Sequence, residues 1–199
     1  MTEDSKYQLI EKSCLYFLTP GPHNTLMTLE KAAQRADELE IADILVSSTS
    51  GRTALEAVEY FKGKNLVIVT HSTGFTGPDY QEFSGKIRKE LVNKGIKVLT
   101  CQHALGGVGR AVRKKLGTYQ LEEIIAYTLR LFGEGTKVAI EMAMMAADAG
   151  LVSSQKPCLS IGGTGRGVDT ALVLIPAPAQ NFFDIRILEI VAKPHFWPK

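Results

Sequence analysis

Hydroxyl residues, a glycine and an arginine interrupt the chain between an apolar run and a helical pattern. Residues 44–54 read ILVSSTSGRTA, which is typical of a buried strand that ends in a turn and opens a helix. The free N–H groups of a helix's first turn favour an anion, and small residues let a phosphate come close. Arg52 adds a forked, permanently charged donor. We therefore predict a phosphate cradle that comprises Ser48, Thr49, Ser50, Gly51, Arg52 and Thr53. The alternative is an ordinary helix start capped by Ser50, and the absence of a GxxxxGK[ST] motif gives no support for P-loop ATP hydrolysis.

A second glycine-rich segment follows the apolar run at 157–161. Residues 162–167 read GGTGRG, a spacing that superficially echoes a dinucleotide-binding loop. Because the next residues lead into another strand and not into a helix, a Rossmann motif is poorly supported. We expect a wall along which the backbone approaches a flat ligand; a plain tight turn is the alternative. The residues assigned to this wall are Gly162, Gly163, Thr164 and Gly165, with Asp169 and Thr170 beside them. Asp169 could accept hydrogen bonds from a ribityl, ribosyl or ring N–H group, or could simply cap the turn.

Two of the four histidines, His71 and His103, follow predicted strands and could share one cleft. With a carboxylate nearby they could perform acid–base chemistry, and we expect His71 to contact a ligand. Phe75, in the loop after His71, either stacks on a ligand ring or folds back onto the core. No HxH or HExxH spacing and no cysteine pair occurs, so we predict no metal site.

Three glycines, at 106, 107 and 109, precede a basic cluster at residues 110–115. We expect a flexible loop with a solvated basic face; a mobile lid over the ligand is the alternative. No aromatic residues interleave with the basic ones and the formal net charge is only +2, so we predict no nucleic-acid partner. The methionines at 142, 144 and 145 are typical of core packing by a buried helix.

The chain has 199 residues, of which 45% are hydrophobic and 22% are charged, and we predict one globular domain over residues 1–199. No apolar run reaches about 18 residues, so we expect no membrane span. The polar N-terminus lacks the apolar core of a signal peptide. The three cysteines lie far apart in the sequence and favour reduced thiols in a cytoplasmic protein.

Strand and helix patterns alternate along most of the chain. The strands are expected at residues 14–19, 43–47, 65–70, 96–100, 157–161, 170–175 and 186–191. The helices are expected at residues 25–39, 52–61, 79–93, 120–132 and 136–149, the first one capped by Asn24 or Thr25. Successive strand–helix units predict a three-layer αβα fold with a mostly parallel sheet, to which the last two strands make an antiparallel addition at one edge. Ligands bind beyond the carboxyl ends of such strands, which selects the loops at 19–25, 47–53, 70–77, 101–107 and 161–170.

The segment from Ser48 to Ala54, its helix and the strand at 65–70 resemble the C-terminal α/β domain of pyruvate kinase. In allosteric pyruvate kinases the matching loop holds a phosphate of a sugar bisphosphate effector. The resemblance therefore implies that Ser48, Ser50, Gly51, Arg52 and Thr53 are phosphate ligands. Thr49 stands where those enzymes often have another residue. The separate barrel that supplies the metal carboxylates and the catalytic lysine of pyruvate kinase has no counterpart here, so we expect no pyruvate kinase activity.

The whole chain is more similar to small stand-alone proteins built from this domain alone. The resemblance rests on Asn24-Thr25, on the loop at 48–53, and on the residues at 162–167 with Asp169-Thr170. It suggests that the protein holds FMN, with the phosphate at the serine-rich loop and the ring near His71, Phe75 and the glycine-rich wall. The expected partner is thus a small phosphorylated ligand, and a homo-oligomer is possible. An enzyme with unidentified catalytic residues, for which His71, His103 and Asp169 are the available acid–base groups, and a sugar-phosphate-sensing regulatory module are the alternatives.

Overall fold

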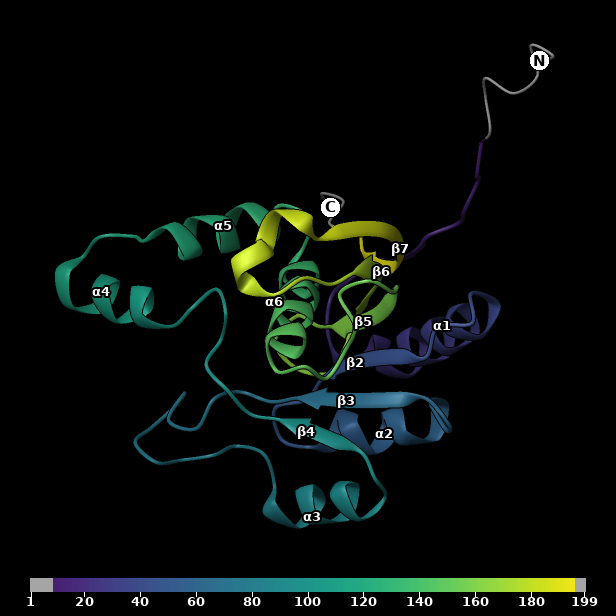
Figure 1. The fold of residues 1–199 in the computed structure, drawn as a ribbon, viewed down its shortest axis with the longest axis horizontal. Coiled ribbons are helices and arrows are strands. Elements are labelled where there is room, and N and C mark those ends of the chain that lie inside the picture. The colour runs from purple at the N-terminus through teal and green to yellow at the C-terminus, as the bar shows by residue number, and fades with distance from the viewer. Residues whose placement is uncertain (1–8, 196–199) are drawn as a thin grey trace.

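Seven strands form one sheet in residues 9–195, the part of the chain that this computed structural model describes (Figure 1). Their order across the sheet is β1-β7-β6-β5-β2-β3-β4. The strands are β1 (Leu15–Phe17), β2 (Asp43–Ser47), β3 (Asn65–Val69), β4 (Lys97–Leu99), β5 (Cys158–Gly162), β6 (Thr170–Ile175) and β7 (Arg186–Pro194). The predicted strands are all present, with shifts of a few residues at their ends.

A single strand, β6, runs against the others in the described sheet. It pairs antiparallel with β5 on one side and with β7 on the other, whereas every other neighbouring pair is parallel. The mostly parallel sheet with an antiparallel element near the C-terminus is thus confirmed. The placement of the last two strands at an edge is wrong in one detail. β1 pairs with β7, because the backbone of residues 15–17 aligns with residues 192–194, and so β1 forms that edge.

Six α-helices and two 3-10 segments connect the described strands. The α-helices are α1 (Thr25–Glu38), α2 (Arg52–Tyr60), α3 (Gly85–Asn93), α4 (Val108–Leu116), α5 (Leu121–Arg130) and α6 (Glu134–Asp148). The 3-10 segments are η2 (Pro22–Asn24) and η3 (Ala179–Asp184). The αβα arrangement follows from where these helices bury their side chains.

Two hydrophobic clusters cover the two faces of the sheet. On one face, Leu29 of α1 and Ala54 of α2 pack with Ile44, Ile68 and other apolar residues of the strands. On the opposite face, α6 packs on the alternate residues of the same strands, which is the period of two that a strand imposes. α6 buries almost its whole surface, including all three methionines, as expected for a central core helix. In α1, Leu29 and Ala36 are buried in the core, whereas Leu26 is 57% exposed.

The predicted helix at 79–93 begins six residues late, at Gly85. Ser84 is its cap, because the Ser84 side chain accepts a hydrogen bond from the amide of Ile87. The preceding residues are tied elsewhere: Gln81 donates to the carbonyl of His71 and accepts from the amide of Phe83. These bonds hold residues 79–84 as an irregular segment before the helix.

The basic cluster at 110–115 lies on a helix. The expectation of a flexible loop is therefore wrong. α4 and α5 extend away from the sheet as an arm, at the left of Figure 1. Arg113 in α4 lies 2.8 Å from the carboxylate of Glu123 in α5, which ties the two helices together. Gly107 and Gly109 thus lie at the start of a helix. The sequence did not predict this helix, because glycine has a low helix propensity.

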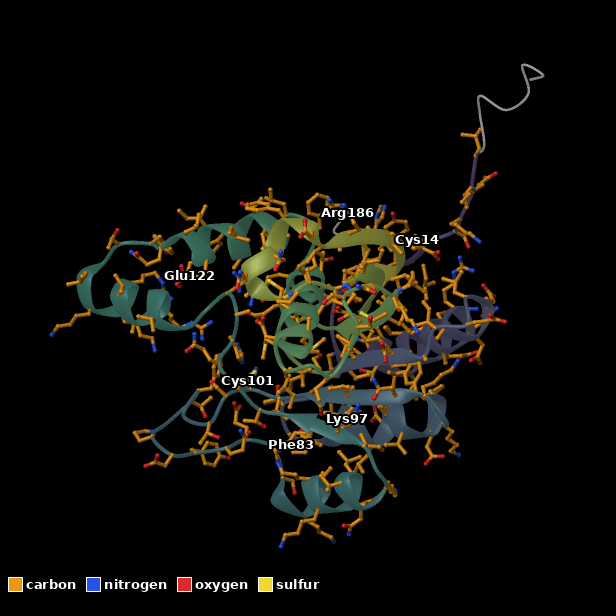
Figure 2. The ribbon with its side chains drawn as sticks, viewed as in Figure 1. Cys14, Phe83, Lys97, Cys101, Glu122 and Arg186 are labelled. Carbon is orange, nitrogen blue, oxygen red and sulfur yellow. The ribbon has the colours of Figure 1, made fainter. Side chains whose placement is uncertain are left out.

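The three cysteines form no disulfide, and Figure 2 shows Cys14 and Cys101 in separate parts of the molecule. Cys158 is buried in the core. Within residues 9–195 no helix combines the length and the apolar character that a membrane crossing requires.

Candidate ligand-binding site

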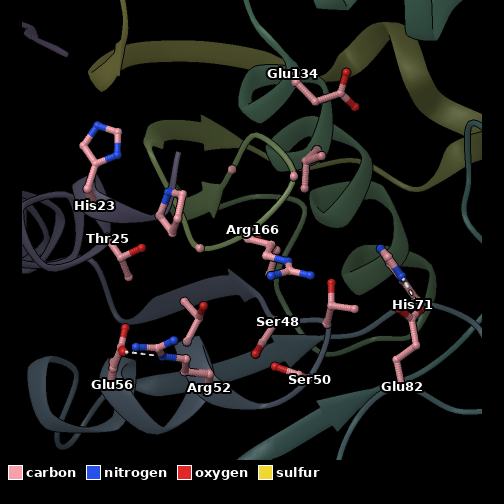
Figure 3. Close-up of a pocket in the computed structure, with 18 of the residues that line it drawn as sticks. His23, Thr25, Ser48, Ser50, Arg52, Glu56, His71, Glu82, Glu134 and Arg166 are labelled. Atoms are coloured by element: carbon pink, nitrogen blue, oxygen red, sulfur yellow. Dashed lines mark hydrogen bonds and ion pairs between the residues drawn. The ribbon is translucent and has the colours of Figure 1, made fainter. Parts of the chain in front are cut away.

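A cavity of about 1110 Å³ opens at the carboxyl ends of the central strands. Five chain segments line it: the start of α1, the loop after β2, the segment after β3, the start of α6 and the hairpin between β5 and β6 (Figure 3). We call it the outer cavity. Its lining residues include Thr25, Ser48, Thr49, Ser50, Arg52, Thr53, Glu56, His71, Tyr80, Glu82, Glu134, Gly163, Gly165, Arg166 and Gly167. The sheet topology therefore brings the predicted loops together at one edge.

Ser48 caps helix α2, a role that the sequence suggested for Ser50. The Ser48 hydroxyl lies 3.2 Å from the amide nitrogen of Gly51 and 3.3 Å from that of Ala54. Gly51 is the residue before the helix and has φ 103°, a left-handed conformation that glycine adopts without strain. Among the described residues, the amide groups of Arg52 and Thr53 have no hydrogen-bond acceptor. Two donors at the positive end of α2 are thus available at the cavity.

Arg52 stands at the rim of this cradle. Its side chain is 88% exposed and lies 3.6 Å from Glu56, one helical turn on. A pair this long and exposed is weak, so the guanidinium can turn to an anion at little cost. Arg166 extends from the hairpin on the other side of the cavity, as Figure 3 shows. Arg166 was missing from the predicted site residues, although it lies within the glycine-rich motif itself.

The segment 162–170 is the tip of a β-hairpin, which we call the glycine-rich hairpin. Gly162 pairs with Thr170, and the amide of Asp169 donates to the carbonyl of Gly162. Of the four residues of the glycine-rich segment predicted to contact a ligand, Gly163 and Gly165 line the cavity, whereas Gly162 and Thr164 do not. Gly162 is buried, and a methyl group there would come within 2.5 Å of the Gly135 carbonyl oxygen. This part of the motif serves the packing of α6 on β5.

Three of the residues predicted to contact a ligand, Asn24, Asp169 and Thr170, are buried behind the cavity wall. Asp169 is fully buried and accepts hydrogen bonds from the Gly21 amide and the Thr170 hydroxyl. The Asn24 side chain donates to the carbonyl of Thr19. Thr25 faces the cavity, but its hydroxyl accepts from the amide of Val168 at 3.1 Å. Asn24, Asp169 and Thr170 thus shape the loops that line the cavity.

His71 and Glu82 form a pair on the cavity wall (Figure 3). The Nδ1 atom of His71 lies 2.7 Å from Oε2 of Glu82, and both side chains are partly exposed. This contact orients the imidazole and leaves its second nitrogen, Nε2, for a ligand. Glu82 was not predicted, because the expected helix at 79–93 would have placed it on a helix surface.

Phe75 folds back on the protein, which was one of its two predicted alternatives. Its ring centroid lies 4.2 Å from that of His71 and 5.0 Å from that of His103, and the Arg110 guanidinium stands 5.0 Å from the same centroid. The rings of His71 and His103 are 5.4 Å apart, so the two histidines do share one site. Burial lowers the pKa of His103 to about 4, and the charges of Lys137 and Arg110 act in the same direction. His103 is therefore neutral at pH 7.

A smaller cavity of about 150 Å³ lies next to the first and shares part of its wall. We call it the inner cavity. It joins the outer cavity at six common residues, which are Ser47, Ser48, Thr49, His71, Glu134 and Val138. Its other lining residues include the aromatic group just described and the buried pair of Lys137 and Glu141. Only the i,i+4 spacing of Lys137 and Glu141, in a helix that is otherwise apolar, pointed to this pair in the sequence.

Among residues 9–195 no three His, Cys, Asp or Glu side chains are grouped so that they could hold a metal ion. Hydroxyl groups, charged side chains and a few apolar side chains line the two cavities. The carboxylates Glu56, Glu82 and Glu134 lie on the outer wall with the two arginines. In the outer cavity, the arginine side chains thus lie at the serine-rich loop (Arg52) and at the glycine-rich hairpin (Arg166).

The fold defines a three-layer α/β domain with a cavity at the carboxyl edge of its sheet. The family profile for "Pyruvate kinase, alpha/beta domain" matches residues 27–174. The chain belongs to this family. A solved structure of Cryptosporidium parvum pyruvate kinase in complex with ADP is similar at 13% sequence identity and a TM-score of 0.39. The match covers 88% of this chain and 25% of that one, so this chain spans about a quarter of the enzyme's length.

Proposed function

We propose that this protein binds a small phosphorylated molecule in the outer cavity, with the phosphate at the start of α2. The observation that carries the proposal is the pair of amide groups of Arg52 and Thr53 without acceptors among the described residues, on residues that line the cavity, with the exposed Arg52 guanidinium beside them. Backbone N–H groups at a helix start and a guanidinium are the donors that a phosphate prefers. Arg166 supplies a second guanidinium from the opposite wall.

FMN is the ligand that we propose. A cavity of about 1110 Å³ has room for a mononucleotide, since ligand sites commonly measure roughly 300–1,000 Å³. Gly163, Gly165 and Gly167 offer a wall without side chains for a flat ring, and His71 stands on another wall. The oxygen-rich wall at residues 47–50 offers hydroxyl groups to a ribityl chain.

The test compares FMN with riboflavin, which has the same ring and chain but no phosphate. Quenching of flavin fluorescence should give an affinity for FMN at least tenfold higher than that for riboflavin, because a charge-assisted hydrogen bond contributes about 1.5–3 kcal/mol. Inorganic phosphate should compete with FMN. Equal binding of both flavins would contradict the phosphate cradle. Stabilisation by phosphate without any flavin binding would retain the cradle and exclude FMN.

A second candidate function is catalysis of proton transfer, and the His71–Glu82 pair favours it. A histidine held by a carboxylate on a cavity wall is the arrangement of a general base. Asp169 and His103, the other predicted acid–base groups, are less suitable, since Asp169 is fully buried and the lowered pKa of His103, about 4, makes it a weak base. In this function His71 would take a proton from the carbon next to a ligand carbonyl, and the electron pair of that C–H bond would pass to the carbonyl oxygen.

Deuterium exchange tests this second function directly. The protein is incubated in D₂O with dihydroxyacetone phosphate, and loss of the ¹H signal at the exchangeable carbon is followed by NMR. Exchange should fall at least about 100-fold in His71→Gln, as expected for loss of a general base. The exposed His23, which also lies on the cavity wall, provides the control His23→Gln, which should exchange at the wild-type rate. An equal loss in both variants would exclude His71 as the base.

A further inference from the structure

The inner cavity is too small for a nucleotide and large enough for a compact organic group. Its volume of about 150 Å³ equals roughly five molecules of liquid water at about 30 Å³ each. A compact group of a few heavy atoms fits there, whereas a whole nucleotide does not. Because the two cavities share His71 and the end of β2, such a group would lie beside whatever occupies the outer cavity.

Charge inside the inner cavity is positive. Three cationic side chains line it, Arg110, Arg130 and Lys137, against two carboxylates, Glu134 and Glu141. Each carboxylate is already engaged: Arg130 lies 2.5 Å from Glu134, and Lys137 contacts Glu141. Within residues 9–195 Arg110 has no carboxylate partner and stands over the Phe75 ring. One guanidinium is thus left for an anion in the cavity.

Lys137 has further donors to offer. It is 4% exposed, and an ammonium group carries three N–H donors, of which Glu141 takes one. Glu141 in turn uses Oε1 to accept the amide of Leu105 at 2.9 Å, which holds the pair in place. A buried ion pair is stable only when its remaining donors find acceptors. Acceptors for Lys137 can come from the cavity that it lines.

We propose that the inner cavity is a subsite for a small carboxylate compound, which Lys137 and Arg110 hold. A carboxylate accepts from an ammonium and from a guanidinium fork at once. The apolar part of such a compound would contact Met142, Met145 and Val69, which also line the cavity. The subsite does not depend on a phosphorylated ligand in the outer cavity, so each can be tested without the other.

The methionines provide a spectroscopic test. In protein labelled at the methionine methyl groups with ¹³C, Met142 and Met145 report on the inner cavity. Met144 packs against Leu105 and Ala126, and Met27 is 44% exposed on α1, so both serve as internal controls. Titration with acetate should shift the signals of Met142 and Met145 and leave those of Met27 and Met144 unchanged. Acetamide, which has nearly the same shape without the charge, should bind at least tenfold more weakly.

Two variants identify the donors. Arg110→Gln removes the unpaired guanidinium, and the double variant Lys137→Leu/Glu141→Gln removes both charges of the buried pair and keeps an acceptor for Leu105. Each should weaken acetate binding at least tenfold, whereas Arg52→Gln, at the outer cavity, should bind acetate as the wild type does. The proposal is overturned if the methionine signals do not move, if acetamide acts as acetate does, or if Arg110→Gln leaves acetate affinity unchanged. Loss of phosphate binding in Arg52→Gln with normal acetate binding would separate the two sites.

Discussion

The amide nitrogen of Gly21 lies 3.0 Å from Oδ2 of Asp169, across 148 residues of sequence. The other carboxylate oxygen, Oδ1, accepts from the hydroxyl of Thr170. Asp169 is fully buried, and its carboxylate thus joins the loop after β1 to the glycine-rich hairpin. This side chain, together with the hydrogen bond from the Val168 amide to the Thr25 hydroxyl, holds two walls of the outer cavity together.

Loss of that carboxylate should destabilise the fold. In Asp169→Ala the buried Gly21 amide loses its acceptor, and we expect a decrease of about 2–3 kcal/mol in the free energy of unfolding. Asp169→Asn, which keeps an oxygen of similar reach, should lose less. Urea denaturation measures both. The exposed Glu30 on α1 offers the control Glu30→Ala, which should change stability by no more than about 0.5 kcal/mol. An equal effect of the Ala and Asn variants would argue against this role.

Two glycines of the hairpin form a matched pair. Gly165 and Gly167 both have positive φ, 77° and 68°. A methyl group at Gly165 meets nothing within 4 Å, but at Gly167 it would come within 2.3 Å of the Thr25 hydroxyl oxygen. We expect Gly165→Ala to cost about 1–2 kcal/mol for the left-handed backbone alone. Gly167→Ala should cost clearly more. Thermal unfolding measures both variants, and equal losses would show that the contact with Thr25 can relax.

Arg52 should matter for binding and not for stability. Its side chain is 88% exposed, so Arg52→Gln should unfold at the wild-type temperature. The same variant should bind inorganic phosphate and FMN about tenfold or more weakly in calorimetric titration. Arg186→Gln is the control, since the Arg186 guanidinium donates to the carbonyls of Phe183 and Ile185. Similar losses in the two variants would indicate a general effect of charge.

The free energy of unfolding should decrease as the pH is lowered, because of His103. Its pKa is about 4 in the folded protein and about 6.5 when unfolded, so the unfolded chain binds the extra proton between these values. The contribution is fully present above pH 6.5 and is lost as the pH decreases toward 4. Between pH 7 and pH 5 the loss should be about 2 kcal/mol. His103→Gln should reduce this slope in urea denaturation, and His23→Gln should keep it.

The Lys137–Glu141 pair should behave as a unit. Lys137→Leu leaves the buried Glu141 carboxylate without its partner, and we expect a loss of about 3–5 kcal/mol. The double variant Lys137→Leu/Glu141→Gln should recover part of it, because glutamine is neutral and can still accept the Leu105 amide. Chemical denaturation of the single and double variants gives the coupling between them. Additive losses would show that the two residues act independently.

The sequence predicted the sheet and the edge at which the cavity lies. Strand β2 is a short apolar run followed by small polar residues, and such a pattern needs only local information. The start of α3 was wrong by six residues, because Ser84 caps the helix while Gln81 is bonded to His71 from outside it. A contact of that kind depends on how the loops meet in space.

Candidate site residues were predicted by type, and their orientations were not. Ser48 and Arg52 lie on the cavity wall, whereas Asp169 and Asn24 turn away from it to bond with backbone groups. A polar side chain near a glycine-rich turn can either contact a ligand or bond to a backbone group. The path of the loop after β1 decides which of these two roles Asp169 and Asn24 have. Glu82 and the inner cavity were missed because they arise where segments distant in sequence meet.

The direction of β6 determines which part of the binding wall can change. Since β6 returns beside β5, the segment between them is a loop closed by its own strand pairing, and no helix has to cross back over the sheet. Residues can be inserted or removed at its tip without altering the register of the parallel strands. In this protein the glycine-rich hairpin is therefore the wall of the outer cavity whose length can change at the least cost to the sheet.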